Sequence, residues 1–174
     1  MGLFSRSGRR AEREIESHVF PESVGSGLDP RPSKTELALL FRGLREWFIC
    51  WAYRHHHQLW LPSRAVDGAW LAFMADDVAY LDFCRSAFGR DLKHDRDPLR
   101  DDSGHAMFET VYAWDRSRAA KRGDSLLWSL DEQLGVESPL GIGSEALTQI
   151  RSNEDPRYGG PFAYGAGDSG GVSF

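Results

Sequence analysis

The sequence predicts an all-α fold, a compact bundle of about five helices, and three observations lead to it. Apolar side chains recur at i, i+3, i+4 and i+7 in several stretches, which is the spacing of one helical face. Residues that cap helices stand at the starts of these stretches, and glycines stand at the ends of several. No stretch shows the clean apolar and polar alternation of a half-buried strand. With 174 residues, the chain has room for one such domain with tails.

We expect the helical domain to span residues 33–150. Residues 1–32 mix arginines with glycine and proline, a composition that does not offset the entropy of ordering, so we expect a flexible basic leader. Within it, Arg9 to Val19 can form a short helix. Residues 151–174 are rich in glycine and aromatic residues and poor in aliphatic ones, which predicts a disordered tail.

The first long helix is expected to start at Ser33. This serine and Glu36 fit a capping box, in which each side chain accepts from the other residue's backbone N–H. An apolar seam then runs from Leu37 to about Tyr53. If the helix continues to Trp60, its length is about 40 Å.

Two further helices are expected between Leu61 and Gly89, where apolar patterning is densest. Ser63 can cap the first, and the glycine suits the left-handed residue that closes the second. The apolar positions of the two helices are Val66, Ala69, Trp70 and Phe73, followed by Tyr80, Phe83, Cys84, Ala87 and Phe88. Their aromatic faces should share one core.

Three more helices follow the charged loop Asp91 to Asp102. One is expected from Ser103 to near Gly123, another from Asp124 to Gly135, and a short one over Ser144 to Ile150.

Charge and cysteine content narrow the classes of partner and compartment. A net charge of -5 argues against a nucleic-acid or anionic-membrane partner, because phosphate binding needs a clustered positive field. No apolar run is long enough to span a bilayer, and no signal peptide is recognisable. Cys50 and Cys84 lie on apolar helical faces, as small hydrophobes do. We therefore expect a cytoplasmic protein that needs no cofactor.

The central segment carries a distinctive series of residues: Leu61-Pro62-Ser63, Val66-Asp67, Trp70, Phe73, Tyr80, Phe83-Cys84, Phe88-Gly89, Leu92 and His94, followed by Trp114, Ser129-Leu130-Asp131 and Leu134-Gly135-Val136. This series resembles the signature of the glycine-rich domain-containing protein-like family. The resemblance covers roughly Trp47 to Val136 and implies a fold and a candidate pocket, without implying a reaction. Leu71 and Lys93 stand where the family usually has histidines, so two of the three imidazoles of that candidate site are missing.

The resemblance points to Asp67, Trp70 and His94 as candidate binding residues, and the apolar seam of the first long helix adds His55. We expect no tightly bound metal, because zinc sites use three or four protein ligands. If a metal binds, then His55, Asp67 and His94 are its candidate ligands, with His105 as a further candidate. Only His55 of the three adjacent histidines continues the apolar seam of its helix, so the alternative is one half-buried histidine with two solvated neighbours.

Three functional hypotheses remain, because no nucleophile elbow, P-loop or H-E-x-x-H motif occurs. The first is a non-catalytic helical interaction or scaffold module, whose protein partner binds in part through the tails. The second is a divalent-metal-dependent enzyme or metal-binding protein. The third is a pseudo-enzyme or small-molecule pocket in which Leu71 has replaced a polar group. The sequence fixes neither the oligomeric state nor a substrate.

Overall fold

The computed structural model describes residues 3–54, 58–94 and 105–152, and within them all regular structure is helical. This confirms the predicted all-α class. The helices are α1 (Leu3–Ser17), α2 (Glu22–Ser26), α3 (Lys34–Arg54), α4 (Arg64–Met74), α5 (Asp77–Phe88), α6 (His105–Asp115), α7 (Leu130–Gln133) and α8 (Ser144–Ser152), with two 3-10 turns, η1 (Ala119–Arg122) and η2 (Leu126–Trp128). The predicted tail, residues 153–174, lies outside the described residues.

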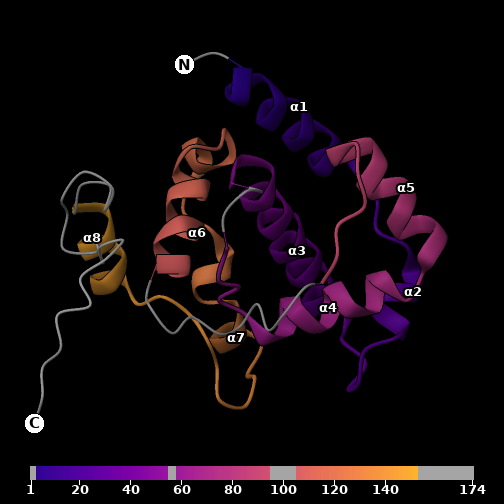
Figure 1. Ribbon diagram of the computed structural model, residues 1–174. Coiled ribbons are helices and arrows are strands. Elements are labelled where there is room, and N and C mark those ends of the chain that lie inside the picture. The colour runs from indigo at the N-terminus through magenta and orange to yellow at the C-terminus, as the bar shows by residue number, and fades with distance from the viewer. Residues whose placement is uncertain (1–2, 55–57, 95–104, 153–174) are drawn as a thin grey trace, which may run out of the picture.

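Helix α3 is the centre of the bundle (Figure 1). It packs against α1, α4, α6, η2 and α7. Close approach is possible because Gly43 has no side chain: a Cβ there would lie 2.6 Å from Leu130 Cδ2 and 2.8 Å from Val66 Cγ2. The absence of a side chain at one α3 position thus sets the distance to both α4 and α7.

Local capping signals determine where several helices begin. Ser33 N–H donates to Glu36 Oε2 at 2.7 Å, and Glu36 N–H donates to Ser33 Oγ at 3.3 Å, which confirms the capping box. Ser63 Oγ accepts from the backbone N–H of Val66 at the start of α4. Gly89 closes α5 with φ of 67°, the left-handed conformation expected there.

Several predicted boundaries are wrong. Helix α3 runs to Arg54, in agreement with the seam predicted to about Tyr53, but residues 58–63 are irregular, so the conditional extension to Trp60 does not form. Helix α6 ends at Asp115 rather than near Gly123, and η1 follows it. The single helix expected after Asp124 is instead η2 followed by the short α7. These are places where tertiary contacts outweigh the local helical pattern.

The N-terminal segment differs most from its sequence-based expectation. The sequence predicts a flexible leader over residues 1–32 with room for a short helix over Arg9 to Val19. The helix forms as α1, but α1 packs on α3 and α5, and α2 packs on α4, so this segment is part of the helical bundle. Ile15 and Val24 are fully buried. Glu12 is also buried and accepts hydrogen bonds from the backbone N–H groups of Arg118 at 3.1 Å and Ala119 at 2.7 Å. The sequence pattern does not predict this, because the compensating donors, which include Tyr53 Oη, lie far from Glu12 in the sequence.

The core is dominated by aromatic rings, as expected, and Trp70 lies in its middle with 1% of its surface exposed. Cys50 and Cys84 are both buried and free, in agreement with their interpretation as small hydrophobes. Burial raises the pKa of each thiol, which keeps both protonated and unreactive. Within the described residues, no helix is both long and apolar enough to cross a membrane.

Candidate functional site

Two places in the described structure bring together side chains that could bind a ligand. One is a histidine–carboxylate pair beside α4, and the other is a pocket between α1, α3, α6 and η1. The pair contains Asp67 from the first turn of α4 and His94 from the segment after α5. His94 Nε2 lies 2.7 Å from Asp67 Oδ1, and each side chain is 16% exposed. The imidazole packs on Trp70, with 4.7 Å between ring centroids. The fold therefore brings together three of the four predicted binding residues, and His55 lies outside the described residues.

A hydrogen-bonded chain beneath this pair holds the segment after α5 in place. Trp70 Nε1 donates to Tyr80 Oη at 3.0 Å, and Tyr80 Oη donates to the Leu92 carbonyl at 2.9 Å. Burial raises the pKa of Tyr80 well above its ordinary value, so the phenol keeps the proton that it donates. These contacts position His94 against Asp67, two residues beyond Leu92.

The described residues supply two candidate metal ligands here. Within the described ranges, no three histidine, cysteine or acidic side chains come together in a way that could hold a metal ion. Leu71 lies one turn after Asp67 on α4, which places both residues on one helical face, and it is about half exposed. Lys93 is exposed as well. Leu71 and Lys93, the two positions that depart from the family pattern, therefore lie at the surface near the Asp67–His94 pair. Leu71 does not line the pocket between α1, α3, α6 and η1.

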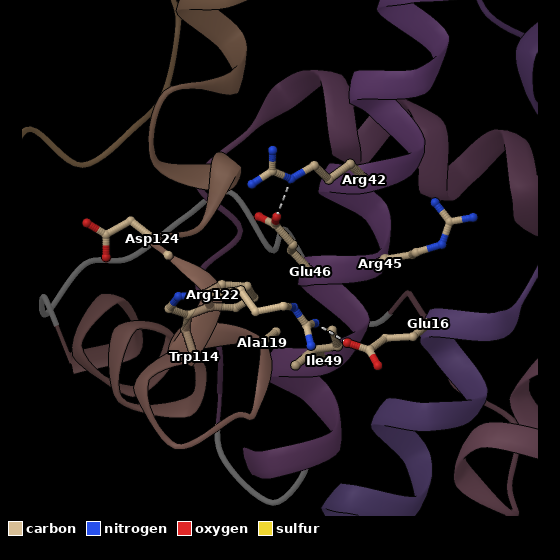
Figure 2. A pocket seen from close by; sticks show the side chains of 10 residues that line it. Glu16, Arg42, Arg45, Glu46, Ile49, Trp114, Ala119, Arg122 and Asp124 are labelled. Atoms are coloured by element: carbon tan, nitrogen blue, oxygen red, sulfur yellow. Dashed lines mark hydrogen bonds and ion pairs between the residues drawn. The ribbon is translucent and has the colours of Figure 1, made fainter.

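The second place is a pocket of about 320 Å³ between α1, α3, α6 and η1, which we call the charged pocket. Figure 2 shows its lining side chains. They are Glu16 from α1, Arg42, Arg45, Glu46 and Ile49 from α3, Trp114 from α6, Ala119 and Arg122 from η1, and Gly123 and Asp124 beyond it. Its volume is at the lower end of the range typical of ligand pockets.

The charges around the charged pocket are paired with one another. Arg42 Nε lies 2.8 Å from Glu46 Oε1, and Arg122 forms an ion pair with Glu16, so that η1 is tied to α1 (Figure 2). Asp124 is bound by Arg151 from α8 at 2.7 Å. Both pocket arginines of these pairs are largely exposed, and exposed ion pairs contribute at most about 1 kcal/mol and exchange partners easily.

Arg45 is different, because its guanidinium meets carbonyl groups and a ring. It donates to the His18 carbonyl at 2.9 Å and to the Phe41 carbonyl at 3.3 Å, and it lies over the Phe20 ring at 5.1 Å. Burial lowers the pKa of Arg45. This arginine connects α3 to the segment after α1, so its contacts in the charged pocket hold the fold together.

Three apolar side chains form the buried part of the charged pocket: Ile49, Trp114 and Ala119. Trp114 Nε1 is buried and has no hydrogen-bond partner in the described structure. Glu46 is buried too, and its Oε2 accepts from Ser125 Oγ at 2.7 Å, which fixes the chain after Asp124 to α3. The pocket thus combines an apolar base with a rim of nearly balanced charge.

Four carboxylates are buried although the sequence pattern does not predict it: Glu12, Glu46, Glu109 and Asp131. Each anchors a segment distant in the sequence. For example, Glu109 of α6 binds Arg54 Nε of α3 at 2.5 Å. Asp131 belongs to the Ser-Leu-Asp element of the family resemblance, which was the one available signal. Its oxygens accept from Ser63 Oγ at 2.6 Å and Arg64 N at 2.8 Å, so its role is to cap α4.

Comparison with known proteins identifies a family for this chain, and the family description names no reaction. The family model described as UCP032817-like matches residues 10–138. This range takes in most of α1, the charged pocket apart from its last contacts with α8, and the Asp67–His94 pair. No curated protein and no solved structure matches the chain. The match does not bear on the glycine-rich designation used for the resemblance above.

Proposed function

The chain belongs to the UCP032817-like family, and we propose that it acts as a non-catalytic helical interaction module that binds a protein partner at the charged pocket. The observation that carries this proposal is the composition of that pocket. A buried tryptophan and isoleucine lie beneath a rim of arginines and carboxylates. Tryptophan and arginine are the residue types that contribute most to protein–protein affinity.

The charge pattern of the rim favours a protein ligand over a small anion. The three arginines are matched by three carboxylates around the same pocket, so no strong single-sign field results. A protein segment with an apolar side chain flanked by charged ones complements such a surface. The apolar side chain would enter the pocket and lie against the small accessible surface that Ile49 and Trp114 leave at its base. The flanking charges would exchange with the exposed pairs of Arg42 and Arg122.

Binding to a protein partner is the test of this proposal. The full-length chain is cross-linked in its native lysate, the captured protein is identified and purified, and its dissociation constant is measured by calorimetry. The double variant Arg42→Ala with Arg122→Ala removes the exposed positive charges of the rim, and Glu46 keeps its hydrogen bond from Ser125. We expect binding at least tenfold weaker, which corresponds to about 1.4 kcal/mol.

A matched control uses two arginines away from the charged pocket. Arg13 and Arg90 are exposed and do not line it, so Arg13→Ala with Arg90→Ala should bind like the natural chain. Equal losses in both double variants would indicate a general charge effect and would contradict the proposal. Loss only on deletion of residues 153–174 would assign binding to the C-terminal tail instead.

One observation favours a second function, a divalent-metal-binding or metal-dependent one. His94 and Asp67 are held 2.7 Å apart over an aromatic ring, an arrangement in which a carboxylate orients an imidazole. His55 follows the last residue of α3 and is the remaining candidate ligand. This second function requires metal bound to the natural chain, which elemental analysis of the purified protein measures.

A further inference from the structure

His18, the residue directly after α1, is partly buried against three aromatic rings. Its imidazole centroid lies 4.6 Å from that of Phe83, 5.0 Å from that of Phe20 and 5.7 Å from that of Phe73. We call these three rings the His18 cage. They come from α5, from the segment between α1 and α2, and from α4, so one imidazole joins three parts of the fold.

The His18 cage suits a neutral imidazole and opposes a charged one. His18 Nε2 is buried and has no hydrogen-bond partner in the described structure, so an added proton there would meet neither water nor an acceptor. The charge that acts on the His18 imidazole is that of Arg45 in α3, whose guanidinium also donates to the His18 carbonyl. A protonated His18 would therefore lie beside a fixed cation.

Among the residues that the structure describes, no carboxylate offsets the field of Arg45 at His18. Helices α4 and α5 present the rings of Phe73 and Phe83 to the imidazole. The acids four and two residues earlier in α1 have other partners, because Glu14 accepts from Ser86 of α5 and Glu16 pairs with Arg122 of η1. Burial, followed by the field of Arg45, lowers the pKa of His18 from its ordinary value of 6.5.

We propose that His18 is an acid-sensitive latch: its protonation releases α1 from α3 and α5, and the Glu16 side of the charged pocket moves away with α1. Because the folded-state pKa is lowered, the neutral form contributes its full stability above about pH 6.5. That contribution is lost as the pH falls through 6.5 toward the folded-state pKa, since the released histidine then binds the proton that the caged one excludes.

The release of α1 is measured by hydrogen exchange of the full-length chain at pH 7.5 and pH 5.5, with rates expressed as protection factors so that the intrinsic chemistry cancels. We expect protection in α1 to fall by up to about tenfold between these two pH values, because pH 5.5 lies one unit below the ordinary histidine pKa of 6.5, while protection in α6 stays constant. The variant His18→Phe fills the cage with a ring that cannot titrate, so its α1 protection should not depend on pH in this range. His105→Gln, which removes a half-exposed histidine, should behave like the natural chain.

A second measurement applies even if His18→Phe does not fold. An NMR titration of the natural chain should find the caged imidazole still neutral at a pH where an exposed histidine is already protonated. The proposal would be overturned if His18 titrated like an exposed histidine while α1 stayed protected from exchange. It would also be overturned if α1 of His18→Phe lost as much protection between pH 7.5 and pH 5.5 as α1 of the natural chain. Only the final step, the effect on the charged pocket, rests on the proposed function. Because α1 release is measured without a partner, the latch and the partner site can fail separately.

Discussion

Asp131 provides the most direct test of how this fold is held together. Its side chain is fully buried, yet both of its oxygens are occupied. Oδ1 accepts from Ser63 Oγ at 2.6 Å and from Ala65 N at 3.1 Å, and Oδ2 accepts from Arg64 N at 2.8 Å and Leu140 N at 3.0 Å. One carboxylate thus caps α4 and also fixes the chain that leads to α8.

Replacing Asp131 by alanine leaves three backbone N–H groups and one hydroxyl without this acceptor. A hydrogen bond to a charged group contributes about 1.5–3 kcal/mol, and part of the loss is offset because a buried carboxylate no longer has to be desolvated. We therefore expect the free energy of unfolding to fall by about 3–5 kcal/mol. Asp131→Asn keeps the shape but turns one acceptor into a donor that faces other donors, and we expect a loss of about 2–3 kcal/mol.

Urea unfolding measures these values, provided that the slope of the transition is the same in every variant. Glu132→Gln is the matched control, because this neighbour is exposed and its substitution should change stability by less than about 0.5 kcal/mol. A loss below about 1 kcal/mol for Asp131→Ala would refute the reasoning. It would mean that water or a neighbouring carbonyl replaces the carboxylate at no great cost.

Two further predictions concern α4. Trp70→Ala removes a buried ring and the donor to Tyr80, so it should lower the free energy of unfolding by about 3–5 kcal/mol, and a loss under about 1 kcal/mol in urea unfolding would contradict its place in the core. The natural chain should carry no stoichiometric zinc or iron by elemental analysis, because a lysine at position 93 offers no lone pair while protonated. Leu71→His together with Lys93→His should create zinc affinity measurable by calorimetry, since the first change places an imidazole one turn from Asp67. Stoichiometric metal in the natural chain that disappears in His94→Ala would overturn this prediction and favour the metal-dependent function.

The sequence by itself determined the helical class and the local signals that start and stop helices. The capping box at Ser33, the cap at Ser63 and the left-handed Gly89 involve partners within four residues, so the residue types at that spacing suffice to form them. The burial of Trp70 also followed from its position on an apolar face. The Asp67 and His94 pairing could be suspected only through the family resemblance.

The tertiary structure alone decided where α1 lies and which carboxylates are buried. Glu12 is favourable inside the protein because Tyr53 Oη and the N–H groups of Arg118 and Ala119, all more than 40 residues later, donate to it. The charged pocket and the His18 cage likewise combine side chains from α1, α3, η1 and other helices. Local periodicity carries no information about such partners, because burial of a polar group depends on what packing brings to it.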